Sequence, residues 1–172
     1  MAGLPGCGFA PLYAQQGLTA NMSQIDIEVP QTRTGYFLEQ DLRNGLGSDQ
    51  VSAKAYVLNI GLLEKHFSVG YRVDETSTRS EITSNVKYTL KELSTGKILY
   101  RGLFTETVTY DTSRSPFTGV ISQEDAQVRI ASAISEKIQT ELALYFRGDA
   151  APEGSVPLQD KQSSSSAAVL AQ

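Results

Sequence analysis

Four segments of the chain alternate between apolar and polar residues with a period of two, which is typical of strands that bury one face. In chain order, the apolar faces are Ile25, Ile27 and Val29; Tyr56, Leu58, Ile60 and Leu62; Ile82, Val86, Tyr88 and Leu90; and Ile98, Tyr100, Phe104, Val108 and Tyr110. Ser94-Thr95-Gly96-Lys97 joins the last two segments as a short loop in which Gly96 can take a positive φ. We therefore expect these two strands to pair as an antiparallel hairpin.

Two further segments have helical periodicity. Leu38 and Leu42 lie four residues apart and Gly45 is a natural stop, which predicts a helix over about 34–44. Ser122 to Asp125 resembles a capping box, so we expect a second helix to begin there. The apolar stripe of this second helix repeats every four residues and consists of Ala126, Ile130, Ile134, Ile138 and Leu142.

The order of these elements is strand, helix, strand, strand, strand, helix. Because each has one apolar face, they predict an α+β fold: a two-layer sandwich with two helices packed on one face of a four-stranded, mostly antiparallel sheet. The other sheet face would be polar, rich in Thr, Lys and Arg. The folded domain is expected over residues 18–147, after a tether at 1–17. Residues 148–172, with the run Ser163 to Ser166, have the composition of a disordered low-complexity tail.

Composition narrows the class of protein. A length of 172 residues suits one domain. The net charge of −4 argues against a nucleic-acid partner, since such proteins usually carry a basic face. No apolar run approaches the roughly 20 residues needed to cross a bilayer as a helix. Any membrane attachment is therefore expected to be an anchor or a docking contact.

Cys7 is the single cysteine of the chain. Leu4-Pro5-Gly6-Cys7 has the form of a lipobox, in which the cysteine becomes a lipid anchor. The alternative is a free thiol near the terminus. Pro5 is unusual at its lipobox position, and only Met1 to Gly6 precede the cysteine, so we expect the signal peptide upstream of the given start.

Residues for catalysis are few. His66 is the only histidine and is expected to be exposed just after a strand. A single histidine excludes a multi-histidine metal site and weakens any histidine-based triad. Gly-rich phosphate loops are absent from the sequence. We therefore predict that the chain is not an enzyme and needs no metal or cofactor.

The segment from Ser68 to Glu81 is expected to be a loop. It places Tyr71 beside Arg72 and carries Arg79 near its end. Arginine clamps phosphate groups well, and an aromatic neighbour suits a ligand that combines phosphates with acyl chains. The alternative is that Arg72 forms ion pairs within a solvated loop.

Several short motifs, in their order and spacing, resemble one family. They are Gly6-Cys7-Gly8-Phe9-Ala10-Pro11-Leu12-Tyr13, Leu38-x-x-x-Leu42-Arg43-Asn44-x-Leu46, Thr78-Arg79 leading to Tyr88-x-Leu90, Ser115-Pro116-Phe117, and Glu124-Asp125-Ala126-x-x-Arg129. The chain resembles LptE, the lipopolysaccharide-assembly lipoproteins of the outer membrane, and in particular their alphaproteobacterial branch. The resemblance extends from Cys7 to about Arg147.

The resemblance implies a fold of two helices on a four-stranded sheet. It implies a lipid anchor at Cys7 on the periplasmic side of the outer membrane. It also implies a role as a plug that helps to assemble an LptD-type β-barrel, and binding of lipopolysaccharide during its delivery to the outer leaflet. Family lipopolysaccharide contacts point to Arg72 and Arg79, with Tyr71 beside them, and to Arg114. The alternatives are an auxiliary lipoprotein subunit of a lipid-transport ABC system and a periplasmic hydrolase.

Overall fold

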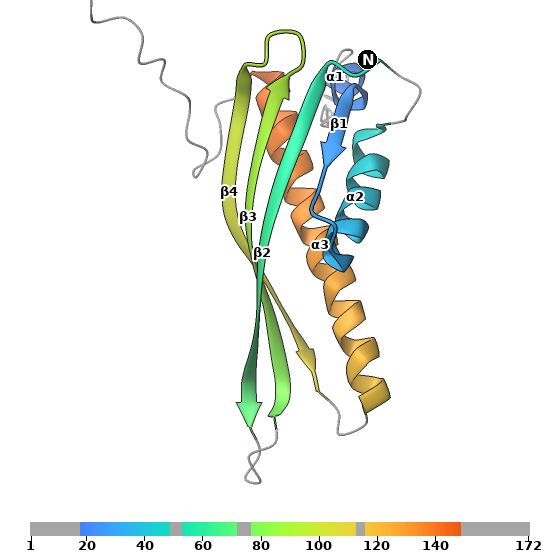
Figure 1. Cartoon of the computed structure of the whole chain (residues 1–172), viewed down its shortest axis with the longest axis vertical. Coiled ribbons are helices and arrows are strands. Elements are labelled where there is room, and N and C mark those ends of the chain that lie inside the picture. Colours follow the sequence, from blue (N-terminus) through green and yellow to red (C-terminus); the bar gives the residue numbers. More distant parts are fainter. Residues whose placement is uncertain (1–17, 49–52, 72–76, 113–115, 149–172) are drawn as a thin grey trace, which may run out of the picture.

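The computed structural model describes residues 18–48, 53–71, 77–112 and 116–148. Predictions about Cys7, Arg72, Arg114, the tether at 1–17 and the tail at 148–172 beyond its first residue concern parts of the chain outside these ranges. Figure 1 shows a sheet on one side and helices on the other. In chain order the elements are α1 (Leu18–Ser23), β1 (Ile25–Glu28), α2 (Arg33–Leu46), β2 (Tyr56–Tyr71), β3 (Ser77–Glu92), β4 (Ile98–Asp111) and α3 (Pro116–Arg147).

The four strands form one mixed sheet in the order β1-β2-β3-β4. β1 is parallel to β2, while β2 with β3 and β3 with β4 are antiparallel. The β3–β4 hairpin is confirmed: Gly96 has a φ of 68°, and the amide of Glu92 donates to the carbonyl of Lys97 at 2.9 Å. The α+β fold and its element order are therefore confirmed, with the short α1 as an addition.

The core lies between the sheet and the helices. The predicted stripe of the last helix is wholly buried, with Ala126, Ile130, Ile134, Ile138 and Leu142 all at 0% exposure. It packs with Leu38 and Leu42 of α2 and with the inner faces of the strands. The apolar periodicity thus identified the buried faces correctly, because burial of those faces is what holds the two layers together.

α2 ends later than predicted. Thr32 caps its start, since its hydroxyl accepts a hydrogen bond from the amide of Gly35 at 3.0 Å. Gly45 is not the stop; it lies inside α2, where a Cβ would meet the side-chain amide of Gln139 of α3. The helix stops at Gly47, whose φ of 62° is the left-handed conformation that ends many helices.

α3 begins earlier than predicted. It starts at Pro116, so Ser122 to Asp125 is not a capping box but lies inside the helix. Proline suits the first turn because the amide it lacks would have no helical partner. Asp125 instead pairs with Arg129 one turn later, and Glu124 forms an ion pair with Arg33 of α2.

The long hairpin of β2 and β3 corrects the predicted loop. β2 continues to Tyr71 and β3 begins at Ser77, so most of the segment from Ser68 to Glu81 is strand. Two register shifts mark β2 between Ser68 and Tyr71. His66 is exposed, as expected, but lies inside β2 rather than after it. Few residues of this segment are apolar, so it lacks the alternation that identifies a half-buried strand in a sequence.

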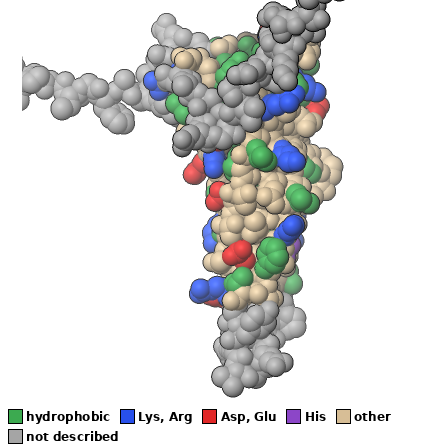
Figure 2. All heavy atoms as spheres, turned by 90° about the vertical axis from the view of Figure 1, so that its left-hand side faces the viewer, with side chains coloured by type: hydrophobic (Ala, Val, Ile, Leu, Met, Phe, Trp, Pro, Cys, Tyr) green, Lys and Arg blue, Asp and Glu red, His purple; other side chains and the backbone are tan. Residues whose placement is uncertain are grey.

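The outer face of the sheet is mixed rather than purely polar. Threonines and asparagines form cross-strand pairs there; Thr105 donates to Asn85 at 2.9 Å, and the hydroxyls of Thr83 and Thr107 lie 3.2 Å apart. Figure 2 views this side, where charged and apolar side chains are interspersed. Large apolar side chains exposed on it include Leu63 at 60%, Leu103 at 58% and Phe67 at 48%.

Candidate ligand-binding site

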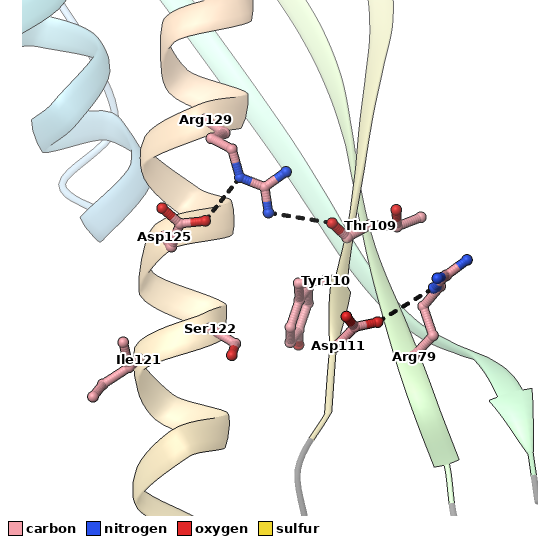
Figure 3. Close-up of a pocket in the computed structure, with 8 residues that line it drawn as sticks. All are labelled: Arg79, Thr109, Tyr110, Asp111, Ile121, Ser122, Asp125 and Arg129. Atoms are coloured by element: carbon pink, nitrogen blue, oxygen red, sulfur yellow. Dashed lines mark hydrogen bonds and ion pairs between the residues drawn. The ribbon is translucent and has the colours of Figure 1, made fainter.

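A pocket of about 490 Å³ lies where the end of β4 passes the first half of α3 (Figure 3). Both elements, together with β3, supply its walls. The lining residues are Arg79 of β3, Thr109, Tyr110 and Asp111 of β4, and Ile121, Ser122, Asp125 and Arg129 of α3.

Helical and strand periodicity place these side chains. Ile121, Asp125 and Arg129 are spaced by four residues, so they follow one another along one side of α3. On β4, Tyr110 belongs to the inner face, and its ring lies between the helix and the strand in Figure 3. Thr109 and Asp111 alternate with it and point to the other face.

Arg129 joins the helix to the edge of the sheet. Its Nε donates to the carboxylate of Asp125 at 2.9 Å, and its Nη2 donates to the backbone carbonyl of Thr109 at 3.3 Å (Figure 3). β4 is an edge strand, so its outward carbonyls have no strand partner among the described elements. The guanidinium therefore holds α3 against β4 and satisfies an edge acceptor at the same time.

Arg79 lies on the neighbouring strand. It is directly opposite Asp111 in the β3–β4 register, and its Nε lies 3.5 Å from the Asp111 carboxylate. Both side chains are well exposed, at 60% and 83%, so the attraction between them is screened by water. A ligand that enters the pocket from solvent can therefore reach the Arg79 side chain.

Two arginines and two aspartates line the pocket, so it holds both donors for an anion and carboxylates that compete with one. Two guanidinium groups can donate hydrogen bonds in a planar fork to a phosphate or carboxylate. Each already lies near one aspartate, so an anion would compete with Asp111 and Asp125. Ile121, which is 51% exposed, adds apolar surface to the lining. Among residues 18–48, 53–71, 77–112 and 116–148, no three acidic, histidine or cysteine side chains gather as metal ligands.

The structure places only part of the predicted site. Arg79 lines the pocket, and Tyr71 is the last residue of β2. Arg72 and Arg114 lie outside the described residues.

Sequence reasoning missed Asp125, Arg129 and Tyr110 as members of the site. Asp125 and Arg129 stood in the sequence as a family motif, which was the available signal. They lie about 50 residues after Arg79 in the chain and meet it only because α3 packs beside β4, a contact that no local pattern encodes.

Comparison with known proteins identifies the class of protein to which the chain belongs. No protein-family model matches the chain, and no curated protein sequence matches it. Among solved structures, a lipoprotein from Caulobacter crescentus is 31% identical with a TM-score of 0.68, and the alignment covers 77% of this chain and 97% of that one. The chain therefore belongs to the family of bacterial lipoproteins that the Caulobacter protein represents.

More distant structures share the fold. Rare lipoprotein B from Shewanella oneidensis is 12% identical with a TM-score of 0.55, covering 72% of this chain and 96% of that one. A minor lipoprotein from Acinetobacter baumannii is 13% identical with a TM-score of 0.54, covering 69% and 89%. Within the described part of the chain, no helix is long and apolar enough to cross a membrane.

Proposed function

We propose that this lipoprotein serves lipopolysaccharide assembly in the manner of LptE. It is anchored through Cys7 on the periplasmic side of the outer membrane. It plugs and helps to assemble an LptD-type β-barrel, and it binds lipopolysaccharide during delivery to the outer leaflet. It acts by binding rather than by catalysis. The resemblance of its motifs to LptE and the lipoprotein family relationship support this proposal together.

The observation that carries the plug role is the uncovered sheet face. β2 and β3 are each 16 residues long and β4 is 14, and the described helices cover only one side of them. The other side presents cross-strand pairs of Thr and Asn with Lys87, Lys91 and Arg101 exposed between them. The lumen of a large barrel is polar, so a rigid, mostly polar sheet suits it.

The observation that supports lipid binding is the pocket of Arg79 and Arg129. Lipopolysaccharide carries phosphates beside acyl chains. A ligand of that kind requires cationic donors next to apolar surface, and Arg79 lies in a pocket that Ile121 also lines. Because Arg79 is exposed, its guanidinium can leave the carboxylate of Asp111 and bind a phosphate of the ligand instead.

Co-purification tests the barrel partner. The tagged full-length lipoprotein is extracted from outer membranes and captured, and a large β-barrel protein is expected to accompany it. Changing Lys87 and Lys91 together to Glu should reduce the captured barrel severalfold, because both lie on the central strand of the uncovered face.

The matched control is Glu136→Lys, a charge reversal at an exposed position on α3, in the helix layer. It should leave capture at the parent's level. Equal capture by the parent and the β3 double variant would remove the sheet face from the contact. Capture of an inner-membrane lipid-binding protein in place of a barrel would favour the alternative, an auxiliary subunit of a lipid-transport ABC system.

A further inference from the structure

β1 covers only a short part of the sheet edge that β2 forms. β1 pairs with β2 only from Tyr56 to Asn59. From Ile60 to Tyr71, no strand in the described part of the chain lies against this edge of β2. An edge without a neighbouring strand can template another strand, because half of its backbone donors and acceptors point outward.

On the outer face of the sheet, this part of β2 carries an apolar side chain on each side of one lysine. Leu63 and Phe67 are 60% and 48% exposed and flank Lys65 on the same face. The stretch from Ile60 to Tyr71 contains no proline that would block pairing. A strand added here would cover both apolar side chains.

The inner side of the edge carries an acceptor that lacks a donor. Oε1 of Glu64 is buried and has no hydrogen-bond partner among the described residues. His66 lies two residues further on the same face and is exposed. A buried carboxylate oxygen without a donor is costly, so a donor that arrives opposite Glu64 would stabilise the pair.

We propose that two copies of the chain associate through this edge, with their β2 strands antiparallel about a two-fold axis at Lys65. When this axis is perpendicular to the sheet, the two sheets join into one, with the inner faces of both copies on one side and the outer faces of both on the other. Leu63 of each copy then lies opposite Phe67 of the other. Glu64 of each copy lies opposite His66 of the other.

The side chains select this register over its neighbours. An axis at Glu64 would oppose two carboxylates, and an axis at His66 would oppose two imidazoles. Only the axis at Lys65 gives two apolar pairs and two pairs of acid with imidazole, each favourable across antiparallel strands. It also opposes the two Lys65 side chains, but their long stems on an exposed face let the ammonium groups separate. Because the complementary residues all come from one stretch, the fitting occupant is a second copy.

Disulfide trapping tests the register in the full chain with Cys7→Ser. Residues that face each other across antiparallel strands are within disulfide distance, so Lys65→Cys should form a linked dimer under mild oxidation. Lys87→Cys is the matched control, an exposed lysine on the same face of the central strand β3. We expect at least about tenfold more linked dimer from Lys65→Cys, since each matched pair favours association. Equal linkage by the two variants would overturn the proposal.

Exchange of the paired residues tests the contact without a cysteine. Glu64→His and His66→Glu should each weaken self-association by about tenfold, because each places like residues opposite one another twice. The double variant restores the opposite pairing and should return to within about threefold of the parent. Sedimentation measures the association, and thermal melting checks that each variant is folded. A folded double variant that associates no better than the single variants, or a parent that stays monomeric at every concentration, would refute the pairing.

Discussion

Gly102 on β4 lies directly opposite Tyr88 on β3, and the ring of Tyr88 occupies the space that a side chain at position 102 would need. Tyr88 is the largest of the fully buried side chains. It packs against Tyr100 and Phe104 at centroid distances of 5.9 and 6.3 Å. The glycine is therefore a requirement of the aromatic packing rather than of a turn.

Gly102→Ala should lower the free energy of unfolding by about 2 kcal/mol, because the added methyl group forces Tyr88 or the strand to move. Gly61→Ala is the matched control on β2. A methyl group there meets only the carbonyl of Lys87 at 3.8 Å, an ordinary contact, so we expect a change within about 0.5 kcal/mol. Urea unfolding measures both. Equal stability of the two variants would mean that Tyr88 does not lie against Gly102.

Tyr88 should also make stability depend on alkaline pH. Burial raises the pKa of its phenol, and the hydrogen bond that the phenol donates to Glu141 raises that pKa further. The unfolded chain loses the phenolic proton near pH 10, while the folded chain keeps it. The contribution of Tyr88 to stability is thus fully present below about pH 10 and declines as the pH rises above it. Tyr88→Phe should show a shallower decline between pH 9 and 11 in urea titrations, and parallel curves for the two proteins would contradict this.

Ile134→Asp should unfold the domain or lower its stability by more than about 4 kcal/mol, since an unpaired charge would be buried under the sheet. Ile134 is 0% exposed. Ile121→Asp is the control on the same helix, where the parent side chain is 51% exposed and the loss should stay below about 1 kcal/mol. Thermal melting compares them. Similar melting temperatures would show that the buried face of α3 is misassigned.

Arg79→Glu should weaken binding of purified lipopolysaccharide by about tenfold while changing stability by no more than about 0.5 kcal/mol. The carboxylate would repel both phosphate and Asp111. Arg101→Glu, on the outer face of β4, is the matched control and should bind as the parent does. A loss of affinity equal in both variants would indicate a general charge effect instead of a site at Arg79.

Cys7→Ser should abolish lipid attachment. When the chain is expressed with a lipoprotein signal peptide, the parent should incorporate labelled palmitate and the variant should not, because Cys7 supplies the only thiol. Membrane fractionation adds a second readout, in which the variant is released wherever a membrane-bound partner does not retain it. Palmitate incorporation by Cys7→Ser would place the lipid elsewhere.

The sequence by itself determined the two-layer fold. Strand alternation and the four-residue stripe from Ala126 to Leu142 identify faces that must leave water, and a chain with these elements in this order has few ways to bury them. The β3–β4 hairpin followed from a loop with Gly96. These signals are local, since each depends on residues within one helix, one strand or one short loop.

Tertiary structure decided where the helices and strands end and which residues meet in the pocket. Gly45 resembles a helix stop in sequence, yet it serves contact with Gln139, nearly a hundred residues away. The far end of β2 and β3 has no apolar alternation in the sequence, and it is the backbone register between the two strands that identifies it as sheet. Arg79 and Arg129 enter one pocket only because α3 packs beside the edge of β4. Contacts between distant segments depend on packing of the whole chain, which local periodicity does not specify.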